Sequence, residues 1–431
     1  MTLIMQKIIN PQRKDWEQIL QRPTQTVEDI ESTVNEVFSE IKKKGDQAVA
    51  KYTSLFDGVS LENFEVSQSE ISEAEKDIPK DLKDAIILAH GNISRFHSAQ
   101  RTEKIRITTS PGVECWQEKR PIEKVGLYIP GGTAPLFSTI LMLAIPANIA
   151  GCKEIILCTP PDRSGNINPA ILYAASLCGI TRIFKIGGIQ AIGALTFGTE
   201  TVPRVYKIFG PGNQFVTVAK QLATKHNVAI DMPAGPSELL VVADDTAKAA
   251  FVASDLLSQA EHGADSQVIL VSTSEKLLDA VKDEIDVQIG DLPRKAIAEK
   301  SMAHCRLILV ENDQVALEMI NDYAPEHFII CTKNEDLYID GIMNAGSVFI
   351  GNYTPESAGD YASGTNHTLP TNGYARQYSG VNLDSFMKSM TFQRITAEGI
   401  KNIGPAIELM AEAEGLQAHK HAVSLRLQAL K

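Results

Sequence analysis

Apolar residues recur along the chain with two different spacings, and the change from one to the other divides it. Residues 13–110 show the three-to-four-residue spacing of amphipathic helices. Its apolar positions include Ile30, Val34, Val37, Phe38 and Ile41, and later Leu82, Ile86, Ala89, Ile93 and Phe96. Gly45 followed by Asp46 predicts the end of one helix and the start of another. The pattern predicts an N-terminal region built from helices.

From about residue 120, short apolar runs of strand type replace the helical pattern. Four runs lie at 125–129, 154–158, 182–186 and 205–209, and five more lie at 238–242, 267–271, 306–310, 327–330 and 347–350. Helical stretches near 138–150, 168–178, 190–197 and 213–226 lie between or after the first four. Strands that alternate with helices favour parallel sheets. We therefore expect an α/β fold with two tandem, doubly wound, Rossmann-like units.

This pattern divides the chain into four regions. They are an N-terminal helical region at 1–120 that packs partly on the second α/β unit, a first unit at 121–235, a second unit at 236–380 and a C-terminal arm at 381–431. The last 60 residues turn polar and irregular before a final helix with Leu416, Ala422, Leu425 and Leu427. That tail could reach a partner subunit or pack on its own chain, and the spacing leaves both open.

Charge and cysteine content narrow the function classes. The formal net charge of −12 argues against nonspecific nucleic-acid binding and against an anionic membrane surface as partner. Residues 125–152 carry no charge, but prolines and glycines interrupt them, so we predict a strand, a turn and a buried helix there instead of a membrane span. The six cysteines include no C-x-x-C pair, and the N-terminus lacks the apolar core of a signal peptide. Reduced core thiols in a cytoplasmic protein are expected.

Glycine-rich turns follow three predicted strands of the first unit. They are Pro130-Gly131-Gly132, Gly187-Gly188-Ile189-Gln190 and Gly210-Pro211-Gly212-Asn213. In open α/β sheets, ligands bind at the carboxyl ends of strands, and each turn precedes a helix whose N-terminal amides favour phosphate. None completes the G-x-G-x-x-G fingerprint, because Phe215 stands where a third glycine would be. A dinucleotide site and ordinary connections both remain open on this evidence.

Candidate metal ligands occur in the second unit and in the last helix. Gln259 and His262 are three residues apart near the end of a helical segment, so they share a face and offer atoms that zinc accepts. A histidine that caps the helix end is the simpler explanation of that pair alone. Asp360 lies in a glycine-rich loop after a strand, where sites are often built. His419 and His421 are two residues apart on a helix, so at most one can face a site.

Glu326 and His327 stand just before the apolar run at 328–330, in the stretch Ala324-Pro-Glu-His327. Pro325 fixes its own φ and biases Ala324 towards extended backbone, which predicts a stiff strand entrance. A carboxylate and an imidazole are well suited to moving protons near neutral pH. A solvated glutamate beside a half-buried histidine is the alternative explanation.

Seven motifs, in order and over nearly the whole chain, resemble those of the histidinol dehydrogenase family. They are Val125-Gly-Leu-Tyr-Ile-Pro-Gly-Gly132, Gly210-Pro-Gly-Asn213, Asp231-Met-Pro-Ala-Gly-Pro-Ser-Glu238, Ser258-Gln-Ala-Glu-His-Gly263, Ala324-Pro-Glu-His327, Ser357-Ala-Gly-Asp360 and Glu414-Gly-Leu-Gln-Ala-His419. The resemblance implies a zinc-dependent enzyme of histidine biosynthesis. Such an enzyme oxidises L-histidinol to L-histidine through the aldehyde with two NAD, as a homodimer with exchanged segments.

The resemblance also implies site residues, transferred motif by motif. The zinc ligands would be Gln259, His262, Asp360 and His419. The NAD contacts, on the first unit, would be Tyr128, Gln190 and Asn213. The substrate contacts would be Ser237, His327 and Glu414 together with the four zinc ligands. Glu414 and His419 would complete the site of the other subunit.

Family resemblance divides the chemistry between Glu326 and His327. His327 would act as the base in both oxidation steps, and Glu326 would activate the water that hydrates the aldehyde. Three alternatives compete with this hypothesis. One is a related dehydrogenase for another polar primary alcohol, and another is a non-catalytic oligomeric scaffold. The third is a zinc hydrolase, against which the absence of an H-E-x-x-H motif argues.

Overall fold

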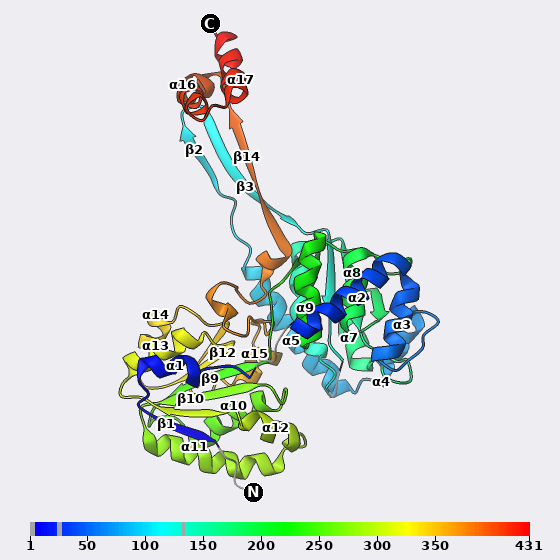
Figure 1. The fold of residues 1–431 in the computed structure, drawn as a ribbon, viewed down its shortest axis with the longest axis vertical. Helices are drawn as coiled ribbons and strands as arrows, with labels where there is room; N and C mark the ends of the chain where they lie inside the picture. Colours follow the sequence, from blue (N-terminus) through cyan, green and yellow to red (C-terminus); the bar gives the residue numbers. More distant parts are fainter. Residues whose placement is uncertain (1–4, 24–27, 132–133) are drawn as a thin grey trace.

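The computed structural model describes residues 5–23, 28–131 and 134–431, and it shows two α/β units and a long, narrow arm (Figure 1). Each unit is a parallel sheet with helices on both faces, so the predicted fold class is confirmed. Gly132 of the first glycine turn lies outside the described residues.

The first unit is built on a five-stranded parallel sheet with the strand order β6-β5-β4-β7-β8. Its strands are β4 (Lys124–Tyr128), β5 (Glu154–Thr159), β6 (Arg182–Lys185), β7 (Lys207–Phe209) and β8 (Ala229–Ile230). Numbered within the unit, this is the order 3-2-1-4-5 of the classic dinucleotide-binding sheet. The strand order reverses between β4 and β7, so the carboxyl ends of these two strands form the expected ligand crevice.

Helices cover both faces of this sheet. One face carries α4 (Gln68–Asp77), α5 (Lys80–Ala99), α6 (Phe137–Ala150) and α7 (Pro169–Leu177). The other carries α2 (Glu28–Lys44), α3 (Asp46–Phe56), α8 (Gly188–Phe197) and α9 (Gln214–Ala223). α6 is buried from Ser138 to Ala147, because it lies between the sheet and α5. The uncharged stretch at 125–152 therefore contains a strand and a buried helix, as predicted.

The N-terminal residues are divided between the two units. α2 and α3 meet at Gly45, whose φ of 53° ends the first helix at the predicted place. Their apolar stripe packs on α8 and α9 of the first unit. By contrast, β1 (Gln6–Ile9) pairs with β11 of the second unit, and Trp16 of α1 (Trp16–Ile19) is buried in that unit's core.

The second unit repeats the arrangement of the first. Its sheet has the parallel order β1-β11-β10-β9-β12-β13, with β9 (Glu238–Ala243), β10 (Gln267–Ser272), β11 (Arg306–Leu309), β12 (His327–Cys331) and β13 (Ser347–Ile350). One face carries α10 (Ala249–Ala260), α11 (Glu275–Gln288) and α12 (Lys295–Met302). The other carries α1, α13 (Asp313–Tyr323) and α14 (Glu335–Gly341), while the short α15 (Glu356–Tyr361) follows β13. Apart from β1, the strand order matches that of the first unit.

The arm projects from the two units as an antiparallel sheet that ends in two helices (Figure 1). Its sheet has the order β14-β3-β2, formed by β2 (Arg106–Ser110), β3 (Val113–Pro121) and β14 (Met387–Ile395). α16 (Ala397–Ala413) and α17 (Gln417–Gln428) pack against each other at its far end. Leu409, Met410, Leu416 and Leu425 of this end are exposed. The tail thus does not pack on the α/β units of its own chain.

The arm is where the sequence-based prediction is wrong. Residues 13–110 were expected to be helical, yet β2 lies at their end, and the polar stretch before the last helix contains β14 and α16. β14 pairs with β3 along nine residues, although the two strands are far apart in the sequence. Across this pair, Phe392 stacks on Trp116 with ring centroids 5.3 Å apart. Such strands are stabilised by distant partners, which local spacing cannot reveal.

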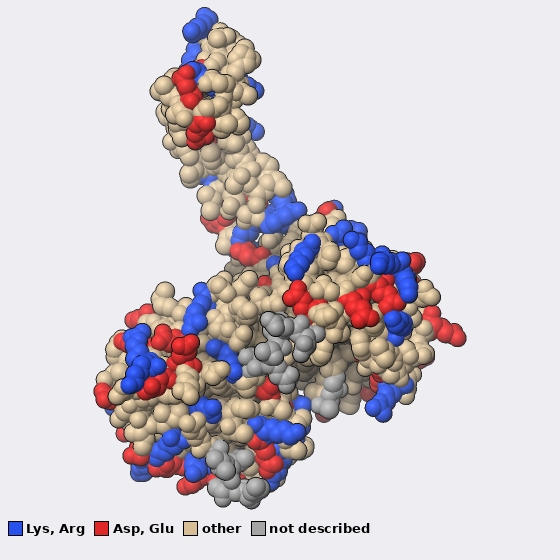
Figure 2. Space-filling model, viewed as in Figure 1, with Lys and Arg blue, Asp and Glu red and all other residues tan. Residues whose placement is uncertain are grey.

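The surface charge agrees with the sequence-based picture. Figure 2 shows acidic and basic side chains interspersed over the visible face of both units, and charged side chains of both signs on the arm as well. No helix within the described ranges has both the length and the apolar character needed to cross a membrane.

Candidate functional site

Glu326 and His327 lie at the amino end of β12, where the chain leaves α13. Ala324 ends that helix at φ 54° and ψ 67°, so the extended geometry predicted for it is wrong. Its N–H donates to the Ile320 carbonyl at 2.8 Å, and this closing helical bond outweighs the usual preference of a residue before proline. Glu326 and His327 are only 6% and 4% exposed, which excludes a solvated glutamate.

Glu238, the first residue of the neighbouring strand β9, holds both side chains. Its N–H donates to Glu326 Oε2 at 2.8 Å, and its carbonyl oxygen lies 3.2 Å from His327 Nδ1. A carbonyl can only accept, so Nδ1 carries the proton and Nε2 is the basic atom of the neutral ring. Nε2 is buried and makes no well-aligned hydrogen bond among the described residues, although Asp360 Oδ1 lies 3.4 Å from it. The geometry leaves a proton acceptor available.

Three carboxylates surround the His327 ring. Glu326 Oε2 and Glu356 Oε1 lie 3.6 and 3.8 Å from Nδ1, and Asp360 Oδ1 lies 3.4 Å from Nε2. Burial alone would lower the pKa of His327, but the charges of Glu356 and Glu326 raise it well above its usual value. Burial in turn raises the pKa of Glu356. The carboxylates therefore favour the protonated ring, whereas the ring can act as a base only in its neutral form.

Three of the four predicted zinc ligands converge beside this pair. Gln259 is buried near the end of α10, and its amide nitrogen donates a hydrogen bond to the Glu356 carboxylate. Ligand atoms of His262, Glu356 and Asp360 all lie within 4.8 Å of one another. This is a set of nitrogen and oxygen donors of the kind that zinc binds. The residues present fit a zinc ion.

Sequence reasoning did not single out Glu356 or the role of His367. Glu356 and Asp360 are four residues apart on α15, and that spacing on a helix could have suggested a shared face. His367 Nδ1 lies 2.8 Å from the Asp360 carbonyl, and its Nε2 lies 3.0 Å from Thr139 Oγ1 of α6. His367 thus ties α15, which carries Asp360, to the first unit; the loop predicted around Asp360 is wrong, because these residues form a short, partly buried helix.

A cleft of about 1240 Å³ lies between the two units and joins these residues to the glycine turns. The first unit lines it with Tyr128, Gly188 and the turn at 210–213, all at the carboxyl ends of strands. The second unit lines it with Ser237 and Glu326, which precede the amino ends of β9 and β12, and with His262, which follows α10. None of the three lies at the carboxyl end of a strand. The rule that ligands bind at carboxyl ends therefore describes the first unit only.

The three predicted cofactor residues adjoin one end of this cleft. The Tyr128 hydroxyl accepts a hydrogen bond from the Gly188 N–H at 3.1 Å, and Asn213 caps α9 through the Val216 N–H at 3.1 Å. Gln190 is fully buried beneath the lining. Gly210 has a φ of 128°, and a Cβ there would lie 2.0 Å from the Tyr128 carbonyl oxygen, so only glycine fits.

The Gly210 turn is braced from below by a buried ion pair. Lys220 Nζ donates to the Gly210 carbonyl at 2.7 Å and lies 2.5 Å from Asp231 Oδ1, while Asp231 Oδ2 accepts from the Gly210 N–H at 2.8 Å. Both peptide groups of the turn are thus fixed, although neither charged residue was singled out from sequence.

Asp57, at the end of α3, is a further carboxylate on the cleft wall. Its Oδ2 accepts a hydrogen bond from Gln190 Nε2 at 2.9 Å. Burial raises the pKa of Asp57 to about 6, and the Gln190 and Gly187 hydrogen bonds offset only part of that effect. Within the described ranges, no ion pair to Asp57 is present.

Glu414 and His419 are not brought to the cleft of their own chain. Both are exposed, Glu414 at the end of α16 and His419 on α17. These two helices form the far end of the arm, well away from the α/β units (Figure 1). Within one chain, the predicted set of four zinc ligands is therefore incomplete.

Comparison with known proteins identifies the family. A family model described as histidinol dehydrogenase matches residues 20–427. The chain belongs to the histidinol dehydrogenase family. A curated histidinol dehydrogenase from Bacteroides fragilis is 58% identical over 99% of this chain and 100% of its own length, and one from Campylobacter jejuni is 50% identical over 98% of each.

Solved structures agree. The crystal structure of a histidinol dehydrogenase from Elizabethkingia anophelis is 57% identical and superposes with a TM-score of 0.98 over 100% of this chain and 99% of that one. An acetylating aldehyde dehydrogenase from Geobacillus thermoglucosidasius, 13% identical with a TM-score of 0.50 over 88% of this chain and 94% of its own, shares a likeness of fold alone.

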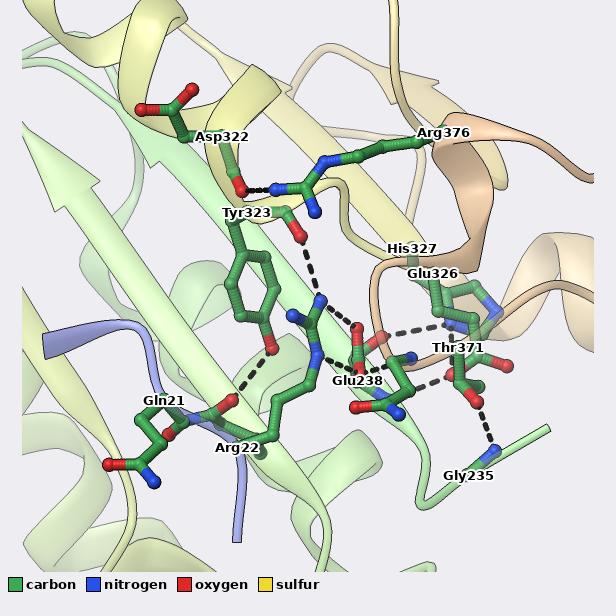
Figure 3. Close-up of polar contacts among 12 residues, drawn as sticks. Gln21, Arg22, Gly235, Glu238, Asp322, Tyr323, Glu326, His327, Thr371 and Arg376 are labelled. Carbon is green, nitrogen blue, oxygen red and sulfur yellow. Dashed lines mark hydrogen bonds and ion pairs between the residues drawn. The ribbon is translucent and has the colours of Figure 1, made fainter. Parts of the chain in front are cut away.

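In this member of the histidinol dehydrogenase family, a buried network fixes the residue that holds the Glu326–His327 pair (Figure 3). Arg22 contacts both carboxylate oxygens of Glu238, at 2.5 and 2.9 Å, and donates to the Tyr323 carbonyl at 2.8 Å. Its guanidinium lies 4.1 Å from the centre of the Tyr323 ring. The Asn372 N–H donates to Glu238 Oε1 at 2.6 Å. Arg22 and Asn372, from opposite ends of the chain, thus meet on the Glu238 carboxylate, and Tyr323 holds Arg22 in place.

Replacing Arg22 by Met should lower the free energy of unfolding by roughly 3–5 kcal/mol, because the Glu238 carboxylate would stay buried without its partner. Urea unfolding at a fixed protein concentration measures the change. Arg13→Met is the matched control, since Arg13 is 68% exposed in its pair with Glu318. An exposed pair contributes about 1 kcal/mol or less. Equal small losses in both variants would contradict the role given to Arg22.

Replacing Asp57 by Asn should raise stability at pH 8 but not at pH 3.5. Because the folded-state pKa is raised from 3.8 to about 6, the stability that Asp57 contributes is present at low pH and is lost as pH rises through 6. A shift of two units corresponds to nearly 3 kcal/mol, which partial exposure reduces to roughly 1–2 kcal/mol. Urea unfolding at both pH values measures it. Asp340→Asn, on an exposed face of α14, is the control, and a gain independent of pH would sink the prediction.

Proposed function

We propose that this chain oxidises L-histidinol to L-histidine through the aldehyde, using zinc and two NAD. The observation that supports it most is the convergence of an acid–base pair with zinc-type donors on one wall of a cleft whose opposite wall bears glycine turns. Family membership and 58% identity to a curated histidinol dehydrogenase support the choice of substrate.

The metal would be held by Gln259, His262 and Asp360 of one chain and by His419 of a second copy. Zinc bound there would attract and orient the amine and imidazole nitrogens of the substrate. Ser237 and His327 would contact the substrate from the same chain, and Glu414 would do so from the second copy. Glu356, wedged between Gln259 and His327, would keep the amide of Gln259 in place.

The proton transfers would be carried out by the buried pair Glu326 and His327. His327 would take the hydroxyl proton of the alcohol at Nε2, the ring nitrogen that Glu238 does not hold, while Glu238 holds Nδ1. Glu326 would accept a proton from water as that water adds to the aldehyde carbon. His327 would then take the hydroxyl proton of the resulting hydrate. The two oxidations together consume one water and yield the carboxylate.

The dinucleotide would lie along the first-unit wall, in contact with Tyr128, Gln190 and Asn213. NAD bound there would accept a hydride from the substrate carbon in each step. The braced Gly210 turn would present backbone N–H groups at the start of α9, a position that favours phosphate. This arrangement supplies phosphate contacts without a G-x-G-x-x-G fingerprint.

We infer a homodimer from the arm. One chain leaves apolar side chains of α16 and α17 exposed on a narrow projection, and it leaves Glu414 and His419 far from its own cleft. A second copy would cover that surface and receive those two residues. The active form would therefore be a dimer with sites shared between subunits.

The function is tested by counting NADH formed per L-histidinol. The wild type should give two NADH, and chelation followed by added zinc should abolish and restore the yield. Glu326→Gln should slow oxidation of the aldehyde by roughly 10²–10⁴-fold and the alcohol step far less, so that NADH approaches one per substrate. His327→Asn should impair both steps.

Single-turnover NADH formation from alcohol and from aldehyde separates the two steps. Equal losses in both steps for Glu326→Gln would contradict the water-activating role. One NADH from the wild type would indicate a simple alcohol dehydrogenase. No NADH from the zinc-loaded enzyme would exclude L-histidinol as the substrate.

Shared sites predict rescue between inactive variants. His262→Ala and His419→Ala should each be inactive alone, but a heterodimer would contain one site with both defects and one intact site. Co-expression with random pairing should restore about a quarter of wild-type activity. A mixture as inactive as either variant would mean that both residues serve the same chain's site. Unchanged dimer mass for both variants is the control.

A further inference from the structure

The cleft ends, on the first-unit side, beside the edge strand β6. The strand order places β6 two strands from β4 and four strands from β8, which is roughly 10 and 19 Å at the usual strand spacing. The chain leaves β8 and reaches Glu238, beside Glu326 and His327, within a few residues. Asp57 and the turn at 187–190 thus lie at the end of the cleft away from the acid–base pair.

A dinucleotide with its redox ring beside His327 would extend across the turns of β7 and β4 towards this end. In sheets with this strand order, an acidic residue near the end of the second strand accepts hydrogen bonds from the adenosine ribose. Here the second strand, β5, ends in Thr159 and is followed by Pro160 and Pro161, which line the cleft. Prolines offer no N–H and no carboxylate.

Asp57 supplies a carboxylate at this same position from a different element. A Cβ on Gly187 would lie 2.5 Å from Pro160 Cβ and 3.1 Å from Asp57 Oδ1, so the end of β5 and Asp57 face the same glycine. Asp162, the nearest acid on the β5 side, accepts the N–H groups of Ser164 and Asn166 through Oδ1, at 2.8 and 2.9 Å. Glu70, Glu73 and Asp77 of α4 also line the cleft, but Asp57 is the acid that shares Gly187 with the end of β5.

The charge around Asp57 favours a neutral ribose over a phosphorylated one. A carboxylate accepts hydrogen bonds from hydroxyls but repels a phosphate. Of the described residues that line the cleft, Lys220 is the one lysine or arginine, and it is engaged by Gly210 and Asp231. No other lysine or arginine of the described lining would neutralise an additional phosphate, and the two lining histidines, His262 and His367, belong to the second unit.

We propose that Asp57 is a specificity-determining residue that admits NAD and rejects its 2′-phosphorylated form. This inference rests on the proposed function, because it presumes a nicotinamide dinucleotide in the cleft. The alternative is that Asp57 acts only through Gln190, by fixing the direction of its amide.

The test is equilibrium binding of NAD and NADP to the zinc-loaded enzyme without L-histidinol, by calorimetry. Asp57→Asn keeps an oxygen that can accept from Gln190 Nε2 but removes the charge. The ratio of the NADP Kd to the NAD Kd should fall by about tenfold or more in Asp57→Asn. Asp340→Asn, which makes the same charge change outside the cleft lining, should leave the ratio unchanged.

The outcomes separate the inference from the function on which it rests. An unchanged ratio in Asp57→Asn, with NAD still bound, overturns the inference alone. A ratio that changes in Asp57→Ala but not in Asp57→Asn also overturns it, because the effect would then come from Gln190. If the wild type binds neither dinucleotide and forms no NADH from L-histidinol, both the function and the inference fall.

Discussion

The contact between Arg22 and Glu238 is the constraint on which the site depends. A carboxylate that is 2% exposed persists only if it is paired and hydrogen-bonded, and Arg22 and the Asn372 N–H satisfy it. Glu238 is the first residue of β9, so its N–H precedes the ladder with β12 and donates instead to the Glu326 carboxylate. Its carbonyl faces β12 and lies 3.2 Å from His327 Nδ1. The peptide groups of Glu238 thus hold Glu326 and His327. The buried and paired side chain of Glu238 thus fixes the positions of the Glu326 and His327 side chains.

Much of the fold could be predicted because it depends on local signals. The buried parallel strands appear as continuous apolar runs, and Gly45 marks a helix boundary that the structure keeps. The arm could not be predicted in this way. β14 has a polar, exposed sequence and exists because β3 pairs with it. Ala324 shows the same limit at a single residue, since helix closure outweighed the effect of Pro325.

The candidate site was predictable only in part from local pattern. Spacing alone could place Gln259 and His262 on one helical face, but it could not bring Asp360 to them, because that meeting depends on α10 and α15 packing together. The pKa values of Glu356 and Asp57 are raised by burial, and both carboxylates contact residues from distant elements. Neither burial nor such contacts can be read from a linear sequence. The assignment of roles came from family resemblance, which carries information that residue chemistry alone does not.

The two units repeat one topology but present opposite ends of their strands to the cleft. The first unit offers glycine turns at carboxyl ends, where backbone N–H groups at helix starts suit phosphate. The second offers side chains at the amino ends of β9 and β12, where the peptide groups of Glu238 can orient a carboxylate and an imidazole. A cleft between such units can bind a charged cofactor on one wall and perform proton transfer on the other. On the proposed function, the arm of a second copy adds a metal ligand that neither wall supplies. The site is then completed only when the dimer assembles.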